Sequence, residues 1–168
     1  EPRPHGERAG VLAGLRYVGR TAVLRGAVLT DVLATVLVMP VALFPVVVDE
    51  RFGGDPAVTG LLLSAVGAGG IVGGLASGLV SRAVRPGRVM IAAAVVWCLG
   101  VAAFGASPWL LLAVAALAVA GAADTFAVIA RGIVTQLATT DEQRGRVSSV
   151  EHVVGVAGPD LGNARGGA

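Results

Sequence analysis

Residues 89–123 read VMIAAAVVWCLGVAAFGASPWLLLAVAALAVAGAA and contain no charged side chain. A helix needs about 20 mostly apolar residues to cross a bilayer, so this run is too long for one span and fits two. The GASP sequence at residues 105–108 divides it, because glycine and proline favour turns. We therefore predict membrane-spanning helices over residues 89–104 and 109–137. Trp109 begins the second, where an indole suits the membrane interface.

Two further spans are predicted upstream. Residues 57–80 carry no charge, and residues 26–48 carry one, Asp31. Pro40 and Pro45 interrupt the earlier span, and we expect a kink there. Membrane helices tolerate such kinks when neighbouring groups satisfy the freed carbonyls.

The composition of the whole chain indicates the same environment. Hydrophobic residues make up 55% of the 168 residues and charged residues only 14%, whereas soluble domains carry about 25% charged residues. Alanine, valine, leucine and glycine supply the apolar mass, as in helices that pack closely in lipid. The predicted fold class is an all-α, polytopic integral membrane protein with four transmembrane helices and the start of a fifth.

Polar segments flank the four-helix region of residues 26–137. Residues 1–25 are predicted to be a cytoplasmic linker and a basic amphipathic lead-in. The lead-in either lies at a membrane surface, as such segments usually do, or is an ordinary polar lead-in to a helix. Residues 138–168 are predicted to be a cytoplasmic loop and the start of a truncated further helix. That helix should face protein, because it carries polar side chains such as Glu151. The chain opens with Glu1 rather than Met, and we expect it to be a piece of a longer protein.

The arginines give the predicted spans a direction. All 13 basic residues are arginine, and ten of them lie in residues 1–25, 82–88 and 144–146, which all fall on one side of the four spans. The other side carries Arg51 beside three acidic residues. The positive-inside rule therefore assigns the arginine-rich side to the cytoplasm. A nucleic-acid partner is not expected, because that would require a basic stripe with interleaved aromatic residues.

A glycine-rich run inside the second span has two interpretations. Gly67, Gly69 and Gly73 resemble a loose dinucleotide-binding pattern, but that fingerprint requires an acidic residue about 20 positions later. This chain has arginines there. The same run contains overlapping small-xxx-small spacings, by which membrane helices approach closely. We therefore predict a helix-packing role for Gly69, Gly70, Gly73, Gly74 and Gly78.

Three charged residues, Asp31, Asp124 and Arg131, fall within predicted spans. A charge in the hydrocarbon costs at least about 3 kcal/mol, so such residues face a partner or a water-filled path. Counting about 1.5 Å per residue places Asp31 and Arg131 at similar depths near the cytoplasmic side, where they can pair. Two interpretations stay open: a salt bridge that only locks helices, or a transport path in which Asp124 carries a proton or cation.

The two basic cytoplasmic turns also have two interpretations. They set the topology and do nothing else, or their arginines hold helix ends in one of two transport states through acids and helix C-termini. The candidate gating residues are Arg82, Arg85, Gly87, Arg88, Asp141, Glu142, Arg144, Gly145 and Arg146.

Side chains for enzymatic chemistry are sparse. The two histidines, His5 and His152, are isolated, and the single Cys98 lies inside an apolar run. A membrane-embedded metalloenzyme would need His, Asp or Glu clustered at ligand spacing, and the sequence has no such cluster. We predict no enzyme activity, no metal site and no cofactor.

Four stretches of the chain resemble major facilitator superfamily transporters, specifically the drug- and siderophore-exporter branch that includes enterobactin exporters. Residues 14–26 resemble the lead-in to the family's seventh helix, and residues 39–45 resemble that helix's kinked outer half. Residues 78–88 resemble the cytoplasmic G-x-L-x-D-R-x-G-R signature, with Ser81 near the position of its Asp. Residues 121–147 resemble the tenth helix and the loop beyond it.

The resemblance implies helices seven to ten and the start of helix eleven, in the C-terminal half of a bacterial cell-membrane transporter. It implies secondary active efflux of a drug-like or siderophore-like small molecule, by proton antiport and alternating access between two six-helix halves. The implied partners are the lipid bilayer, the missing N-terminal half and remaining helices, and the small-molecule substrate. The alternative is a small non-transporting membrane protein, an assembly or scaffold subunit complete in four helices.

Overall fold

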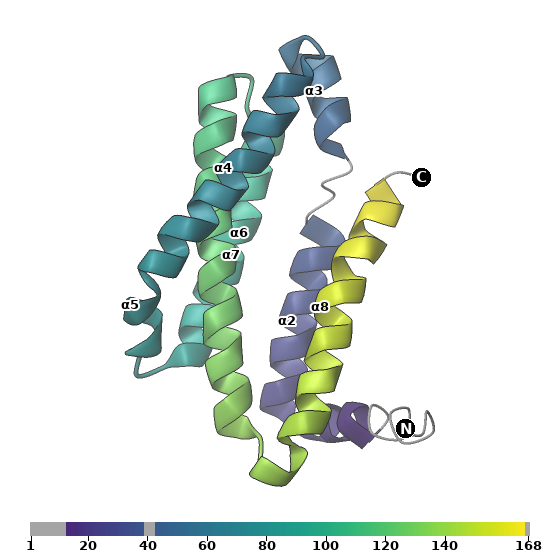
Figure 1. Cartoon of the computed structure of the whole chain (residues 1–168), viewed down its shortest axis with the longest axis vertical. Helices are drawn as coiled ribbons and strands as arrows, with labels where there is room; N and C mark the ends of the chain where they lie inside the picture. Colours follow the sequence, from purple (N-terminus) through teal and green to yellow (C-terminus); the bar gives the residue numbers. More distant parts are fainter. Residues whose placement is uncertain (1–12, 39–42, 167–168) are drawn as a thin grey trace, which may run out of the picture.

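The chain folds as a bundle of helices in a computed structural model that describes residues 13–38 and 43–166 (Figure 1). These residues are helical almost throughout, and no strand occurs among them. After a short helix over residues 13–20, the helices are α2 (Ala22–Val38), α3 (Phe44–Phe52), α4 (Pro56–Leu75), α5 (Ser77–Ser81), α6 (Pro86–Ala106), α7 (Leu110–Ala138), the 3-10 turn η2 (Asp141–Gln143) and α8 (Arg144–Gly166).

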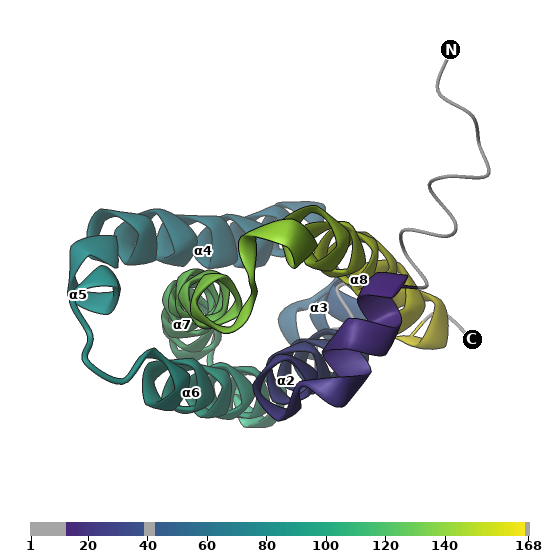
Figure 2. The same cartoon turned by 90° about the horizontal axis from the view of Figure 1, so that it is seen from below.

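Helix α7 lies at the centre of the bundle. It packs along its length between α4 and α6, and α2 and α8 lie beside this group as a second, paired layer (Figures 1 and 2). Helix α2 also contacts α6 and α7. The architecture is therefore a three-helix core, α4–α6–α7, with the α2–α8 pair against one side.

Within residues 13–38 and 43–166, three helices are long and apolar enough to cross a membrane: α4, α6 and α7. Helices α6 and α7 cover the segments expected at residues 89–104 and 109–137, and α6 is longer than expected because Pro86 serves as its first-turn residue. The segment expected at residues 57–80 is divided: α4 ends at Leu75, and α5 continues after a break at Ala76. These helices agree with the predicted class, an all-α membrane protein, without fixing the number of spans.

The segment expected to be the first span, residues 26–48, contains parts of two helices, α2 and α3. The expected kink at Pro40 lies outside the described residues. Pro45 begins a helix instead of kinking one, since it occupies the first turn of α3, where a missing N–H costs no hydrogen bond. Helices α2 and α3 together extend from one end of the bundle to the other (Figure 1). The count of four spans stays a prediction.

The turn at residues 105–108 divides the long apolar run as expected. Helix α6 ends at Ala106 and α7 begins at Leu110. The Ser107 hydroxyl donates to the Trp109 carbonyl at 2.9 Å and accepts from the Trp109 amide at 3.3 Å. Trp109 is 72% exposed, as an interfacial indole would be.

The arginine-rich segments gather at one end of the bundle. Helix 13–20, the turn from α5 to α6 and the turn from α7 to α8 all lie at the lower end in Figure 1, whereas the α3–α4 turn with Arg51 lies at the upper end. Part of the predicted cytoplasmic loop is helical, because η2 begins at Asp141 and α8 at Arg144. Helix 13–20 lies across the base of α2 and packs Val18 against Leu24 and Val150.

The end of the bundle that carries the α3–α4 turn has a compact apolar core. Phe44 of α3 and Phe104 of α6 place their ring centroids 5.1 Å apart, and both pack with Leu62 and Leu117. Large apolar side chains also cover the outside of the bundle, where Leu75 is 85% exposed. Such a surface is unfavourable in water and suits contact with lipid.

Glycines bring α4 and α7 into backbone contact. A Cβ at Gly69 would overlap the carbonyl of Ala118, and one at Gly73 would come within 2.8 Å of the Ala122 carbonyl oxygen. From the other helix, a Cβ at Gly121 would overlap the carbonyl of Val66. The interface therefore requires glycine on both helices.

The remaining glycines of the predicted packing set differ. Gly70 accepts a hydrogen bond at 3.3 Å from the Thr125 hydroxyl of α7. A Cβ at Gly74 or Gly78 would meet nothing within 4 Å among the described residues. The packing role expected at Gly74 and Gly78 therefore stays a prediction. Gly67 lies within α4, so no strand leads into the glycine run as a dinucleotide site requires.

Candidate functional site

An ion pair links the two layers of the bundle. Asp31 of α2 contacts the Arg131 guanidinium of α7, and the two side chains are only 18% and 19% exposed. Depth counting from the sequence predicted that these residues could meet, and the structure brings them together. Because each charge neutralises the other where water is scarce, removing either would leave an uncompensated charge.

The third charge predicted to lie within a span, Asp124, is at the same place. Asp31, Asp124 and Arg131 line one cavity of about 20 Å³, together with Thr30 and Trp97. That volume is close to the space of a single water molecule. Two carboxylates and one guanidinium therefore share a small polar chamber between α2, α6 and α7.

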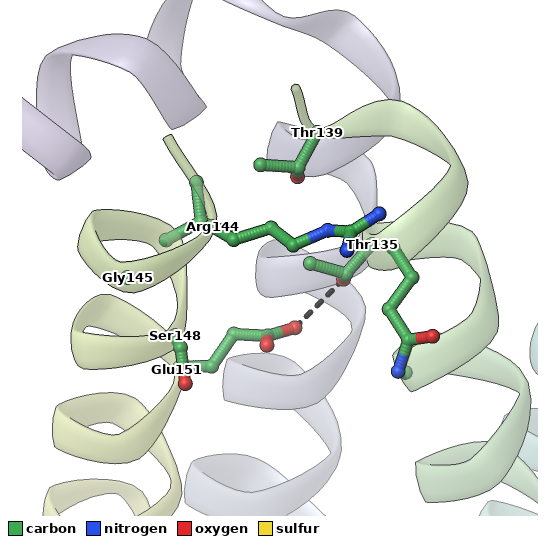
Figure 3. Close-up of a pocket in the computed structure, with 9 residues that line it drawn as sticks. Thr135, Thr139, Arg144, Gly145, Ser148 and Glu151 are labelled. Atoms are coloured by element: carbon green, nitrogen blue, oxygen red, sulfur yellow. Dashed lines mark hydrogen bonds between the residues drawn. The ribbon is translucent and has the colours of Figure 1, made fainter. Parts of the chain in front are cut away.

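Glu151 is a site residue that the sequence interpretation did not select. The Thr135 hydroxyl of α7 donates to the Glu151 carboxylate of α8 at 2.7 Å (Figure 3). The Glu151 carboxylate also acts electrostatically on the Arg131 guanidinium. One feature of the sequence pointed to this region: Arg131 and Thr135 are four residues apart, which places both on one face of α7.

A larger polar pocket of about 540 Å³ lies between α7 and α8. Figure 3 shows the Arg144 side chain extending between Thr139 and Thr135, above the Glu151 carboxylate. The Thr139 hydroxyl is buried and has no hydrogen-bond partner in the described part of the chain. Hydroxyl, carboxylate and guanidinium groups make this pocket suitable for a polar occupant. Its lining residues are Gly132, Thr135, Gln136, Thr139, Arg144, Gly145, Val147, Ser148 and Glu151.

The predicted gating residues of the α7–α8 turn contact one another locally. Arg144 and Asp141 form an exposed ion pair at 3.0 Å, and the Arg146 guanidinium donates to Gln143 at 3.3 Å. Glu142 and Gly145 are exposed beside them.

The predicted gating residues of the α5–α6 turn are arranged differently. Arg82, Arg85 and Arg88 are exposed, and no ion pair involves them in residues 13–38 and 43–166. Gly87 lies in the first turn of α6. The α5–α6 and α7–α8 turns therefore lie at the same end of the bundle, and no ion pair between the described residues connects them.

The opposite end of the bundle has one notable polar contact. The Arg51 guanidinium donates a hydrogen bond to the carbonyl of Gly105, close to the C-terminus of α6, where carbonyl groups lack helical partners. Arg51 and residues 105–108 line a pocket of about 340 Å³. This contact connects the α3–α4 turn to the α6–α7 turn.

The described residues contain no group of three or more His, Cys, Asp or Glu side chains that could hold a metal ion. Cys98 is a free thiol of intermediate burial, and His152 is exposed on α8.

The sequence model of the family described as transmembrane secretion effector matches residues 6–168. This chain belongs to that family of major facilitator superfamily transporters. The resemblance noted in the sequence is thereby confirmed. The relatives of this chain are efflux transporters, which are not enzymes.

Curated relatives include enterobactin exporters EntS of three Escherichia coli strains, O1:K1 / APEC, O127:H6 (E2348/69 / EPEC) and O139:H28 (E24377A / ETEC). Each is 27% identical over 164 residues, which cover 98% of this chain. The chain spans 39% of the length of these relatives. No solved structure matches it significantly.

Proposed function

We propose that this chain forms part of the C-terminal half of a longer proton-coupled efflux transporter. The observation that carries the proposal is the Asp31–Arg131 ion pair, which shares a cavity with Asp124 between helices of a membrane-transporter family. Charged groups in a bilayer interior are costly and usually serve a transport path or its lock.

The charge balance of this cavity supports a coupling role. Its two carboxylates exceed its one guanidinium by a negative charge, and a proton or cation would neutralise that excess. Asp124 is the candidate carrier, because Asp31 already pairs with Arg131. Binding and release of a proton at Asp124 would then change the charge between α2 and α7 during transport.

Alternating access requires helices that can change partners. In such folds the path lies between two six-helix halves, and the face of α2, α7 and α8 carries the polar cavities described above. The exposed arginines of the α5–α6 turn are available to contact the other half at the cytoplasmic end. We place the protein in the bacterial inner membrane, with its arginine-rich end in the cytoplasm.

The proposed cargo is a drug-like or siderophore-like small molecule. The relatives are exporters of enterobactin, and the pocket between α7 and α8 offers hydroxyl, amide and charged groups to a polar molecule. A non-transporting scaffold is not favoured, because relatives and family are transporters.

Export by the full-length protein in everted vesicles tests this proposal. We expect a proton gradient to drive accumulation of a catecholate siderophore or a cationic dye, and we expect an uncoupler to abolish it. A protein that moves neither class of molecule in any gradient would support the scaffold alternative. The matched control is the same vesicle preparation carrying an Arg131→Gln variant.

A further inference from the structure

Arg131 and Thr135 occupy successive turns on one face of α7, and they contact different neighbours. Arg131 pairs with Asp31 of α2, whereas Thr135 donates to Glu151 of α8 at 2.7 Å. Four residues of helix correspond to a rise of about 6 Å. The two acids of α2 and α8 therefore approach α7 one turn apart.

The arginine lies close to both acids along α7. Its guanidinium contacts Asp31, and the next turn of α7 holds Glu151 through Thr135. An arginine side chain is long enough to reach along one helical turn, so a small displacement of α8 relative to α7 would bring Glu151 to the guanidinium. Helices α2 and α8 pack directly on each other (Figure 1), so a movement of one is transmitted to the other.

Resting on the proposed function, we propose that Glu151 is the second partner of Arg131 and that transport exchanges Arg131 between Asp31 and Glu151. In this structure Arg131 forms an ion pair with Asp31, and the Thr135 hydroxyl donates a hydrogen bond to Glu151. In the second transport state Arg131 pairs with Glu151, and Asp31 faces the cavity that it shares with Asp124. Glu151 is thus a positioning residue that acts through Arg131.

The exchange has a physical basis in the count of charges. One guanidinium cannot fully neutralise two carboxylates on different helices, so two pairings compete and each stabilises a different position of α8. A hydroxyl donor at Thr135 lowers the cost of leaving the half-buried Glu151 without the arginine, since a carboxylate withdrawn from water needs hydrogen-bond donors. Switching between discrete packed arrangements of this kind is how small shifts become conformational changes.

Cysteine labelling in the full-length transporter tests the exchange. Ser148 lines the pocket between α7 and α8, so a Ser148→Cys probe in a Cys98→Ser background reports how open that pocket is. Asp31→Asn leaves Glu151 as the available partner, and Glu151→Gln leaves Asp31. We expect these substitutions to change the labelling rate in opposite directions, each by about fivefold or more, as for typical coupling between two states.

Two control variants separate this mechanism from simple loss of structure. Glu50→Gln removes an exposed carboxylate at the far end of the bundle and should leave the labelling rate unchanged. Glu151→Asp keeps the charge and should restore labelling toward the wild-type rate. Equal or same-direction changes for Asp31→Asn and Glu151→Gln would overturn the exchange. Export by the wild type is measured in parallel, and its absence would instead count against the proposed function.

Discussion

Asp31 and Arg131 join α2 to the central helix α7 through a largely buried ion pair. Helix α2 otherwise contacts the three-helix core through small apolar residues such as Ala27, which packs with Ala130. Interhelical contacts between small residues in lipid depend on close packing, because no hydrophobic driving force acts there. Together with the Thr135–Glu151 hydrogen bond between α7 and α8, this ion pair connects the two layers through polar side chains.

Breaking this pair should destabilise the fold measurably. Asp31→Asn leaves the Arg131 guanidinium without its carboxylate partner, and we expect a loss of about 3–5 kcal/mol in unfolding free energy. The measurement is unfolding of the full-length protein in detergent, with the exposed Asp49→Asn as the control. Adding Arg131→Gln should recover part of the loss, since the uncompensated charge is then gone. A double variant that loses as much stability as the sum of the two single losses, or more, would contradict the pairing.

Glycine positions in α4 provide a matched pair of substitutions. Gly69→Ala places a methyl group against the Ala118 backbone, and we expect it to cost about 1–3 kcal/mol, as overpacking does. Gly74→Ala meets open space and should stabilise the helix by up to about 1 kcal/mol. Thermal unfolding of the two variants side by side measures the difference. Equal effects would show that α4 does not approach α7 along the Gly69 face.

Arg51 should stabilise the end of the bundle that carries the α3–α4 turn. Arg51→Gln removes its hydrogen bond to the Gly105 carbonyl, and a hydrogen bond from a charged group contributes about 1.5–3 kcal/mol. Hydrogen exchange at the α6–α7 turn should accelerate, while exchange near α8 stays as in the wild type. Arg20→Gln, an exposed arginine at the opposite end, is the control. Unchanged exchange at the α6–α7 turn would contradict this role.

The predicted orientation is tested by labelling from each side of the membrane. In a Cys98→Ser background, Ser81→Cys at the α5–α6 turn should react only with reagent in the cytoplasm. Glu50→Cys near the α3–α4 turn should react only from the outside. The arginine distribution gives the reason, since positively charged segments are retained in the cytoplasm. Reaction of Ser81→Cys from the outside would reverse the assignment.

Much of this arrangement is predictable from the sequence because the strongest signals are local. The uncharged run at residues 89–123 specifies two helices and a turn, and the structure has them. Depth counting also indicated that Asp31 and Arg131 could pair, and the structure brings them into contact.

Other features depend on which face of a helix meets its neighbour. The four-residue spacing recurs at Gly69, Gly73, Gly74 and Gly78, yet a Cβ would clash only at the first two. The spacing alone does not say which face of the helix meets α7, so it cannot distinguish the glycines that pack against α7 from those that do not. Glu151 went unselected because its significance comes from Thr135 on another helix. Pro45 was expected to kink a helix, and it lies in the first turn of α3 instead.

Proton coupling at Asp124 tests the account most directly. Full-length transporter in everted vesicles would be energised, and substrate-dependent proton release would be recorded together with substrate uptake for the wild type and Asp124→Asn. We predict that Asp124→Asn keeps substrate binding and loses substrate-dependent proton movement and uphill transport. An Asp124→Asn protein that accumulates substrate and moves protons as the wild type does would contradict the account.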